Sequence, residues 1–273
     1  MSKILITGGT GTLGKALTRE LLKTDVEQIR IFSRDEYKQE RMSEEIQDKR
    51  VEYLLGDVRD WRRLELACRN VDSVVHMAAL KVVPWLEYNP MECNKTNVQG
   101  TENVAEVCDS VGVKNCIYIS TDKAVNPCNI YGHSKAMGER IILDFNNWST
   151  CIYSVIRFGN LIGSRGSVVE KWGDAKLKGE PILVTDWDMV RYWISPQQAA
   201  RCIIEVIKRR SPSIYIPEMQ EISLRDIFEQ MHLDKDSVKM IGLREGEKLK
   251  EELYLPNEVV KWLGGCECKI KLF

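Results

Sequence analysis

Short apolar runs alternate along residues 1–160 with longer segments in which apolar side chains recur every three or four positions. Runs of the first kind are typical of buried strands, and segments of the second kind are typical of amphipathic helices. The sequence predicts strands at residues 3–7, 28–32, 51–55, 73–76, 115–120 and 154–158. It predicts helices at residues 13–22, 36–46, 61–68, 92–110 and 129–145. Repeated strand–helix units predict an α/β fold with a doubly wound parallel sheet of Rossmann type.

The alternation breaks after residue 159, where the sequence becomes rich in Gly and Ser and continues as mixed short elements. We therefore expect a larger dinucleotide-binding part, residues 1–165, which residues 192–216 join again. Residues 166–191 and 217–273 are expected to form a smaller substrate-binding lid. No linker in the sequence is long enough to separate independent domains.

Charge is balanced over the 273 residues, because 39 Lys and Arg side chains accompany 40 Asp and Glu side chains. A chain of this composition has no broad basic face with which to bind nucleic acid or an anionic membrane surface. An anionic ligand must therefore be held by a local cluster of donors. The hydrophobic content of 44% is enough for a large core.

Nine cysteines occur without a C-x-x-C pair, and the chain has only three histidines. This composition predicts reduced thiols and no metal site. The chain begins with a strand pattern at residues 3–7, which leaves no room for a signal peptide, and no apolar run approaches about 18 residues. We expect a cytoplasmic protein.

A glycine-rich turn, Gly8-Gly-Thr-Gly-Thr-Leu-Gly14, joins the first predicted strand to the first predicted helix. Its glycines fit both G-x-G-x-x-G and G-x-x-G-x-x-G. Glycines in this context let backbone N–H groups and the helix N-terminus approach a pyrophosphate. A tight turn without a ligand is the alternative, but the order of strand, glycines and helix favours a dinucleotide site. The predicted contacts are with Gly8, Thr10, Gly11, Thr12, Leu13 and Gly14.

The end of the second predicted strand indicates which dinucleotide this is. An acidic residue at this place binds the ribose 2′-hydroxyl of NAD, whereas this chain has Ser33 and Arg34, and an acid follows only at Asp35. A hydroxyl and a guanidinium suit the 2′-phosphate of NADP through charge-assisted hydrogen bonds. The sequence therefore predicts NADP as the cofactor, and a solvated surface side chain is the alternative interpretation of Arg34.

Candidate catalytic residues follow the fifth predicted strand. Thr121, Asp122 and Lys123 come first, and Tyr131 and Lys135 then open the next predicted helix. Because they are four positions apart, Tyr131 and Lys135 share a helix face. An ammonium beside a phenol favours the phenolate and lowers its pKa from about 10, as a general base at neutral pH requires. We predict this pair to be catalytic, and two surface side chains are the alternative.

Several segments match one family across nearly the whole chain. They are Ile31-Phe-Ser-Arg-Asp-Glu36, Gly56-Asp-Val-Arg-Asp60, Ala79-Leu-Lys81, Tyr88-Asn-Pro90, Ser120-Thr-Asp-Lys-Ala124, Arg157-Phe-Gly-Asn160, Gly163-Ser-Arg-Gly-Ser-Val168 and Arg244-Glu-Gly-Glu-Lys248. Together they resemble the inverting UDP-N-acetylglucosamine 4,6-dehydratases, which belong to the extended short-chain dehydrogenase/reductase superfamily and open pseudaminic acid biosynthesis. The resemblance implies removal of water from UDP-N-acetylglucosamine with inversion at C5, giving UDP-2-acetamido-2,6-dideoxy-β-L-arabino-hex-4-ulose. It also implies cofactor contacts by Asp57, Val58, Ala78, Ala79 and Lys81.

Dehydration needs more groups than oxidation at C4 alone. We expect Tyr131 to take the C4 hydroxyl proton while NADP⁺ takes the hydride. A base then removes the C5 proton, and an acid protonates the leaving C6 hydroxyl. Finally, the hydride returns to C6. Similar epimerases usually carry small or hydroxyl residues where this chain has Asp122 and Lys123, and retaining dehydratases generally carry Asp-Glu. The pair resembles the inverting family, with Asp122 as acid and Lys123 as base, and a salt bridge at the strand end is the alternative. The alternative functions are a nucleotide-sugar 4-epimerase and an NADP-sensing protein without catalysis, although such sensors typically lack the Tyr and Lys.

The same resemblance assigns contacts with the UDP-sugar to residues spread over the second half of the chain and to Lys81. They are Lys81, Asn160, Arg165, Ser167, Val168, Arg191, Arg244 and Glu247. Surface charge in a lid is the alternative for Arg191 and Glu247. Related enzymes assemble through helices beside the sheet, so a homo-oligomer is expected.

Overall fold

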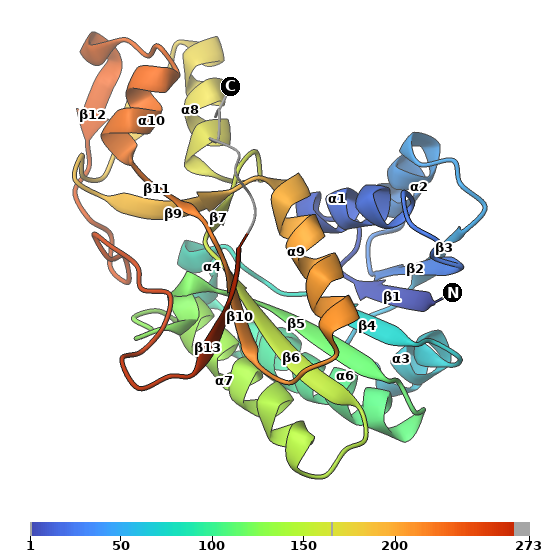
Figure 1. Ribbon diagram of the computed structural model, residues 1–273. Helices are drawn as coiled ribbons and strands as arrows, with labels where there is room; N and C mark the ends of the chain where they lie inside the picture. Colours follow the sequence, from blue (N-terminus) through green and yellow to red (C-terminus); the bar gives the residue numbers. More distant parts are fainter. Residues whose placement is uncertain (1, 165, 265–273) are drawn as a thin grey trace.

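The computed structural model describes residues 2–164 and 166–264, and its main feature is an eight-stranded sheet (Figure 1). The strand order is β13-β10-β6-β5-β4-β1-β2-β3, and each neighbouring pair is parallel. The strands are β1 (Lys3–Thr7), β2 (Gln28–Ser33), β3 (Val51–Leu55), β4 (Ser73–His76), β5 (Asn115–Thr121), β6 (Ile152–Phe158), β10 (Ile214–Pro217) and β13 (Val260–Leu263). The predicted α/β fold with a parallel sheet of Rossmann type is confirmed.

Helices cover both faces of this sheet because alternate strand residues point to opposite faces. Ile4 and Ile6 belong to the core that includes residues of α1, α2 and α9, whereas Leu5 belongs to the core that includes residues of α3, α6 and α7. The long helices are α1 (Thr12–Leu21), α2 (Glu36–Glu45), α3 (Trp61–Cys68), α6 (Gly100–Ser110), α7 (Ile130–Asp144) and α9 (Pro196–Arg209). Around β5 and α7 lie the 3₁₀ turns η2 (Asp122–Ala124) and η3 (Phe145–Asn147).

The helix predicted over residues 92–110 is divided in the structure. The short helices α4 (Val83–Tyr88) and α5 (Pro90–Cys93) are followed by a π-helix, η1 (Asn94–Gln99), before α6 begins. π-Helical turns are rare and often accompany functional sites. This one contains Asn97, whose side-chain amide accepts from Leu80 N at 2.8 Å and donates to Leu80 O at 2.9 Å. The wider turn thus occurs where α6 is attached to the loop after β4, a long-range contact that helical periodicity does not reveal.

The smaller part has a core of its own around Trp172, Trp193 and Phe228. Its elements are β7 (Asn160–Leu161), α8 (Val168–Lys178), β8 (Ile182–Val184), β9 (Val190–Ile194), β11 (Gln220–Ser223), α10 (Leu224–Gln230), η4 (Lys235–Ser237) and β12 (Val238–Met240). β9 lies between β7, to which it is parallel, and β11, to which it is antiparallel. β8 and β12 form a separate parallel pair.

The structure differs from the predicted division of the chain at several strands. β7 and residues 192–194 of β9 were expected in the larger part, but they belong to the three-stranded sheet of the smaller part. β13 falls within residues 217–273, which were expected in the lid, yet it pairs with β10 at the edge of the main sheet. The reason is that β10 offers a free edge there, and backbone N–H and C=O groups at such an edge favour pairing with a further strand. Within residues 2–164 and 166–264, no helix has the length and apolar character needed to cross a membrane.

Candidate active site

A cleft of about 1910 Å³ is lined by residues at the carboxyl ends of the central strands and by residues of the smaller part. This is the edge of an open α/β sheet at which ligands bind. Of the predicted site residues that the structure describes, every one except Asp122 lines the cleft; Arg165 lies outside the described residues. The structure thus brings together side chains from the glycine turn, from four strand ends and from the lid.

The glycine turn has the shape of a phosphate cradle. Gly8 has φ +69°, and a Cβ there would lie 2.8 Å from Ala78 Cα, while a Cβ on Gly14 would lie 2.2 Å from Gly9 O. Packing therefore requires glycine at both positions. Gly11 differs, because a Cβ there would meet only Gly8 O at 3.4 Å, so an added side chain would intrude on the cleft. Gly11 is also the N-cap of α1, and no described side chain caps this helix, so its first N–H groups are available to a phosphate.

Arg34 and Ser33 lie where a ribose 2′-substituent is expected. The Arg34 guanidinium lies 3.6 Å from the Asp57 carboxylate, and its side chain is 49% exposed. Burial tends to raise the pKa of Asp57, but hydrogen bonds from Arg59 and the charge of Arg34 outweigh burial and lower it. The hydroxyl of Ser33 accepts from the Gln39 amide at 2.9 Å. The ion pair with Asp57 is therefore long, and the half-exposed guanidinium of Arg34 can still donate hydrogen bonds to an anion.

A buried chain of hydrogen bonds supports the loop after β4. Thr7 Oγ1 accepts from Ala78 N at 3.3 Å and lies 2.7 Å from His76 Nδ1, while His76 Nε2 lies 3.0 Å from Thr101 Oγ1. Thr101 donates its own hydroxyl proton to Asn97 O at 2.6 Å, so its oxygen must accept a hydrogen bond from His76 Nε2. The proton of the neutral ring is therefore on Nε2, and Nδ1 accepts from the Thr7 hydroxyl. Burial and then the charge of Lys135 lower the pKa of His76 to about 3, consistent with this neutral ring.

Tyr131 and Lys135 both line the cleft, but their electrostatics differ from the prediction. Burial and then the charge of Asp122 raise the pKa of Tyr131 above its usual value, although a hydrogen bond with Thr121 acts the other way. Burial also lowers the pKa of Lys135 to about 7, against the effect of Glu139. The predicted lowering of the Tyr131 pKa is therefore wrong for the protein by itself, because desolvation disfavours the phenolate.

The contacts of Lys135 explain how a cation is tolerated in this buried place. Its Nζ donates to Ile119 O at 2.6 Å and lies 3.8 Å from the centre of the Tyr118 ring. The ring face is the negative part of the aromatic quadrupole, so it attracts the ammonium. Tyr118 itself is enclosed by Gly138, where a Cβ would lie 2.2 Å from the Tyr118 hydroxyl.

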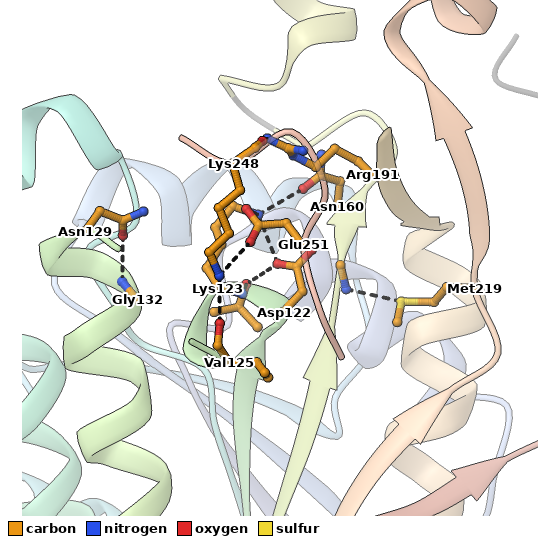
Figure 2. Close-up of polar contacts among 12 residues, drawn as sticks. Asp122, Lys123, Val125, Asn129, Gly132, Asn160, Arg191, Met219, Lys248 and Glu251 are labelled. Atoms are coloured by element: carbon orange, nitrogen blue, oxygen red, sulfur yellow. Dashed lines mark hydrogen bonds and ion pairs between the residues drawn. The ribbon is translucent and has the colours of Figure 1, made fainter. Parts of the chain in front are cut away.

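Asp122 and Lys123 form an ion pair on η2, with Lys123 Nζ 2.9 Å from Asp122 Oδ1 (Figure 2). Thr121 Oγ1 donates to the same carboxylate oxygen at 2.9 Å. The Asp122 side chain is completely buried, and its Oδ2 has no hydrogen-bond partner among the described residues. Lys123 is 21% exposed, and its Nζ also lies 3.5 Å from Asn160 Oδ1. Lys123 therefore lies at the cleft wall with Asp122 behind it.

The lid residues take part in local hydrogen bonds as well as lining the cleft. Ser167 caps α8 by accepting from Glu170 N, directly before Val168 opens the helix. The Arg244 guanidinium lies 3.8 Å from Glu247, which also accepts from Arg244 N at 3.2 Å. The Arg191 side chain is buried, so for this residue the surface-charge alternative is wrong.

The structure also shows polar cleft residues that the sequence analysis missed. Glu251 lies 3.7 Å from Lys123 Nζ, and Asn129, the N-cap of α7, donates to Gly246 O at 2.8 Å. Lys248, which does not line the cleft, donates to Val125 O at 2.9 Å. A helix-capping Asn before Tyr131 is a local signal that can be found in a sequence. Nothing in the spacing of Lys248 and Glu251 indicates that they meet η2. No group of three or more potential metal ligands occurs within the described residues.

Comparison with known proteins shows which protein family and which solved structures this chain resembles. Residues 4–264 match the family of polysaccharide biosynthesis proteins. A UDP-N-acetylglucosamine 4,6-dehydratase (inverting) of Campylobacter jejuni is 43% identical over 91% of this chain and 76% of its own length. A UDP-glucose 4-epimerase of Rickettsia rickettsii is 35% identical over 94% of this chain and 79% of its own. The crystal structure of DesIV, a dTDP-glucose 4,6-dehydratase from Streptomyces venezuelae with NAD and TYD bound, has a TM-score of 0.85 at 22% identity over 92% of this chain and 88% of its own, which shows the shared fold.

Proposed function

Because the chain belongs to the family of polysaccharide biosynthesis proteins, we propose that it is an inverting UDP-N-acetylglucosamine 4,6-dehydratase. The observation that carries the proposal is that Lys123 and Tyr131 face the same cleft as the glycine turn. A 4-epimerase needs the glycine turn and Tyr131, but it removes no water and therefore needs no additional acid and base. The ion pair of Asp122 and Lys123 supplies those two groups.

A bound nicotinamide dinucleotide would supply hydride transfer, out from C4 of the sugar and back to C6. The glycine turn and the uncapped start of α1 fit its pyrophosphate. Asp57 and Val58 lie where its adenosine end would be held, and Ala78, Ala79 and Lys81 line the way to Tyr131. We propose NADP rather than NAD, because Arg34 has exposed donors beside the ribose position.

Tyr131 would take the proton of the C4 hydroxyl. Desolvation raises the pKa of this phenol in the protein by itself, so proton loss has to be driven by positive charge that reaches the site with the cofactor. Thr121 would keep the phenol in place by a hydrogen bond. Lys135 would hold the cofactor ribose from the same helix face, since its ammonium is fixed one turn away from Tyr131.

Lys123 would remove the C5 proton once C4 is a ketone, because the ketone acidifies that position. Asp122 would give a proton to the C6 hydroxyl, which then leaves as water. Returning a proton to the opposite face of C5 inverts that centre. Since Asp122 lies behind Lys123, we propose that its proton reaches the leaving group only after a rotation of the Lys123 side chain.

The lid would hold the UDP part. Asn160, Ser167, Val168, Arg191, Arg244 and Glu247 line this end of the cleft. The division into a sheet-bearing part and a lid, a homo-oligomeric state and a cytoplasmic location belong to the same proposal.

Incubation of the protein with UDP-N-acetylglucosamine tests the proposal. We expect a product lighter by one water molecule, with solvent deuterium at C5 in D₂O and the L-arabino configuration by NMR. A product that keeps its 6-hydroxyl would identify a 4-epimerase instead. Unchanged configuration at C5 would identify a retaining dehydratase.

A further inference from the structure

Lys123 contacts two carboxylates, and the second comes from a distant part of the chain. Glu251 Oε1 lies 3.7 Å from Lys123 Nζ, and Asp122 Oδ1 lies 2.9 Å from the same nitrogen (Figure 2). The Glu251 side chain is 4% exposed and that of Asp122 is completely buried. Carboxylates are rarely buried unless they are paired, and here both are paired with the same ammonium group.

The backbone that carries Glu251 is held firmly. The Arg191 guanidinium donates to Lys248 O at 2.7 Å and to Leu249 O at 2.9 Å, and Val190 N donates to Leu249 O at 2.9 Å. Arg191 therefore ties residues 248–251 to β9. Further along, Arg157 makes paired hydrogen bonds with Glu258 and with Glu139 of α7. The position of Glu251 next to Lys123 is thus set by contacts on both sides of it.

The charges around Lys123 balance. Lys248 Nζ lies 3.6 Å from Glu251 Oε2 and donates to Val125 O at 2.9 Å. Two ammonium groups and two carboxylates therefore share the site, and Tyr131 is close enough to Asp122 for the charge to act on it. Neither Asp122 Oδ2 nor Glu251 Oε2 has a hydrogen-bond partner within the described residues, so ion pairing stabilises these carboxylates.

The elimination moves protons within this charge balance. Lys123 must first pass a proton to Asp122. The amine can then take the C5 proton and become an ammonium again, and Asp122 can give its proton to the leaving hydroxyl and become a carboxylate again. One proton enters the pair and one leaves it, so the total charge is conserved. The Glu251 carboxylate pairs with the Lys123 ammonium, so it stabilises the positive charge that develops there.

We propose that Glu251 is a positioning residue for the elimination step, which holds Lys123 at the cleft wall and balances the charge that Lys123 gains. The inference rests on the proposed function. Glu251 acts on C5 deprotonation through Lys123, and among the described residues no hydrogen bond or ion pair joins it to Tyr131. Loss of its charge should therefore slow the loss of water without slowing the oxidation of C4.

The test compares Glu251→Gln with the parent protein in a single turnover with NADP and UDP-N-acetylglucosamine. Glu251→Gln should oxidise C4 at close to the parent rate, seen as absorbance of the reduced nicotinamide. It should lose water about 10- to 100-fold more slowly, because a misplaced catalytic group costs about this much. Reduced cofactor should therefore accumulate in Glu251→Gln and not in the parent. Glu251→Asp, which keeps the charge with a shorter reach, should show a smaller delay.

Glu252→Gln is the matched control. Glu252 is the next residue, is exposed and accepts from Asn126 at 2.8 Å, so its amide variant should behave as the parent does. Thermal unfolding and NADP binding would show that each variant is folded. If Glu251→Gln does not fold, accumulation of reduced cofactor in Glu251→Asp carries the test.

Two results would overturn the inference while the proposed function stands: unchanged kinetics in the folded variant, or equal slowing of C4 oxidation and water loss. Equal slowing would mean that Glu251 only maintains the fold. If the parent itself releases no dehydrated product, the proposed function fails, and the role of Glu251 fails with it.

Discussion

The Nζ atom of Lys123 lies 2.9 Å from Oδ1 of Asp122, and only the lysine of this pair lines the cleft. The ammonium thus separates a completely buried carboxylate from the space where a substrate would bind. A proton must move between them and the substrate before water can leave.

Lys123→Ala is expected to stop the reaction after C4 oxidation, because the ketone forms but no base reaches C5. Solvent deuterium should then fail to enter C5, as measured by mass spectrometry of recovered sugar nucleotide. Lys250→Ala is the control, since Lys250 pairs with Glu221 at an exposed site. Deuterium entry at the parent rate in Lys123→Ala would exclude Lys123 as the base.

Asp122→Asn is expected to slow departure of the C6 hydroxyl more than exchange at C5. The amide keeps the volume of Asp122 but cannot supply the proton. Comparing the rate of water loss with the rate of deuterium entry measures this difference. Equal effects on both rates would mean that Asp122 serves only to hold Lys123.

Arg34→Glu is expected to reverse the cofactor preference. The parent should bind NADP about 10- to 100-fold more tightly than NAD, because a hydrogen bond to a charged group contributes about 1.5–3 kcal/mol. Titration of each cofactor by calorimetry measures the two affinities. Arg62→Glu, on the exposed start of α3, should leave them unchanged. Equal affinity of the parent for both cofactors would remove the basis of the NADP proposal.

Tyr131→Phe is expected to reduce turnover about 10²- to 10⁴-fold, the usual contribution of a general base. Cofactor affinity should be kept, because the change removes one hydroxyl and little volume. The measurements are product formation and NADP binding, with the exposed Tyr37→Phe as control. A Tyr131→Phe protein with half the parent rate would exclude the assigned role.

His76 is expected to make the fold sensitive to acid. Its pKa is about 3 in the folded protein and 6.5 in an unperturbed histidine, so between these values the unfolded chain binds a proton that the folded chain does not. The free energy of unfolding therefore falls as the pH decreases through this window. The melting temperature should fall less steeply below pH 6.5 in His76→Gln than in the parent. His133→Gln, at an exposed position, should keep the parent slope, and a parent slope in His76→Gln would contradict this origin.

The sequence by itself determined the features that depend on neighbouring residues. Strand and helix bounds along β1 to β6 agree with the predicted ranges to within two residues, apart from the divided helix before α6. The glycine turn is largely local, because the positive φ of Gly8 and the close contact of Gly14 with Gly9 arise within that turn. Tyr131 and Lys135 share a helix face because of helical geometry alone.

Only the tertiary structure decided the electrostatics of the site. The direction of the Tyr131 pKa follows from burial, and burial depends on elements that are distant in sequence. The side chain of Lys123 faces the cleft, whereas that of Asp122 is completely buried. Glu251 reaches Lys123 because Arg191 and Lys248 hold its backbone near η2. Side-chain direction and desolvation arise from such long-range packing, which residue spacing cannot show.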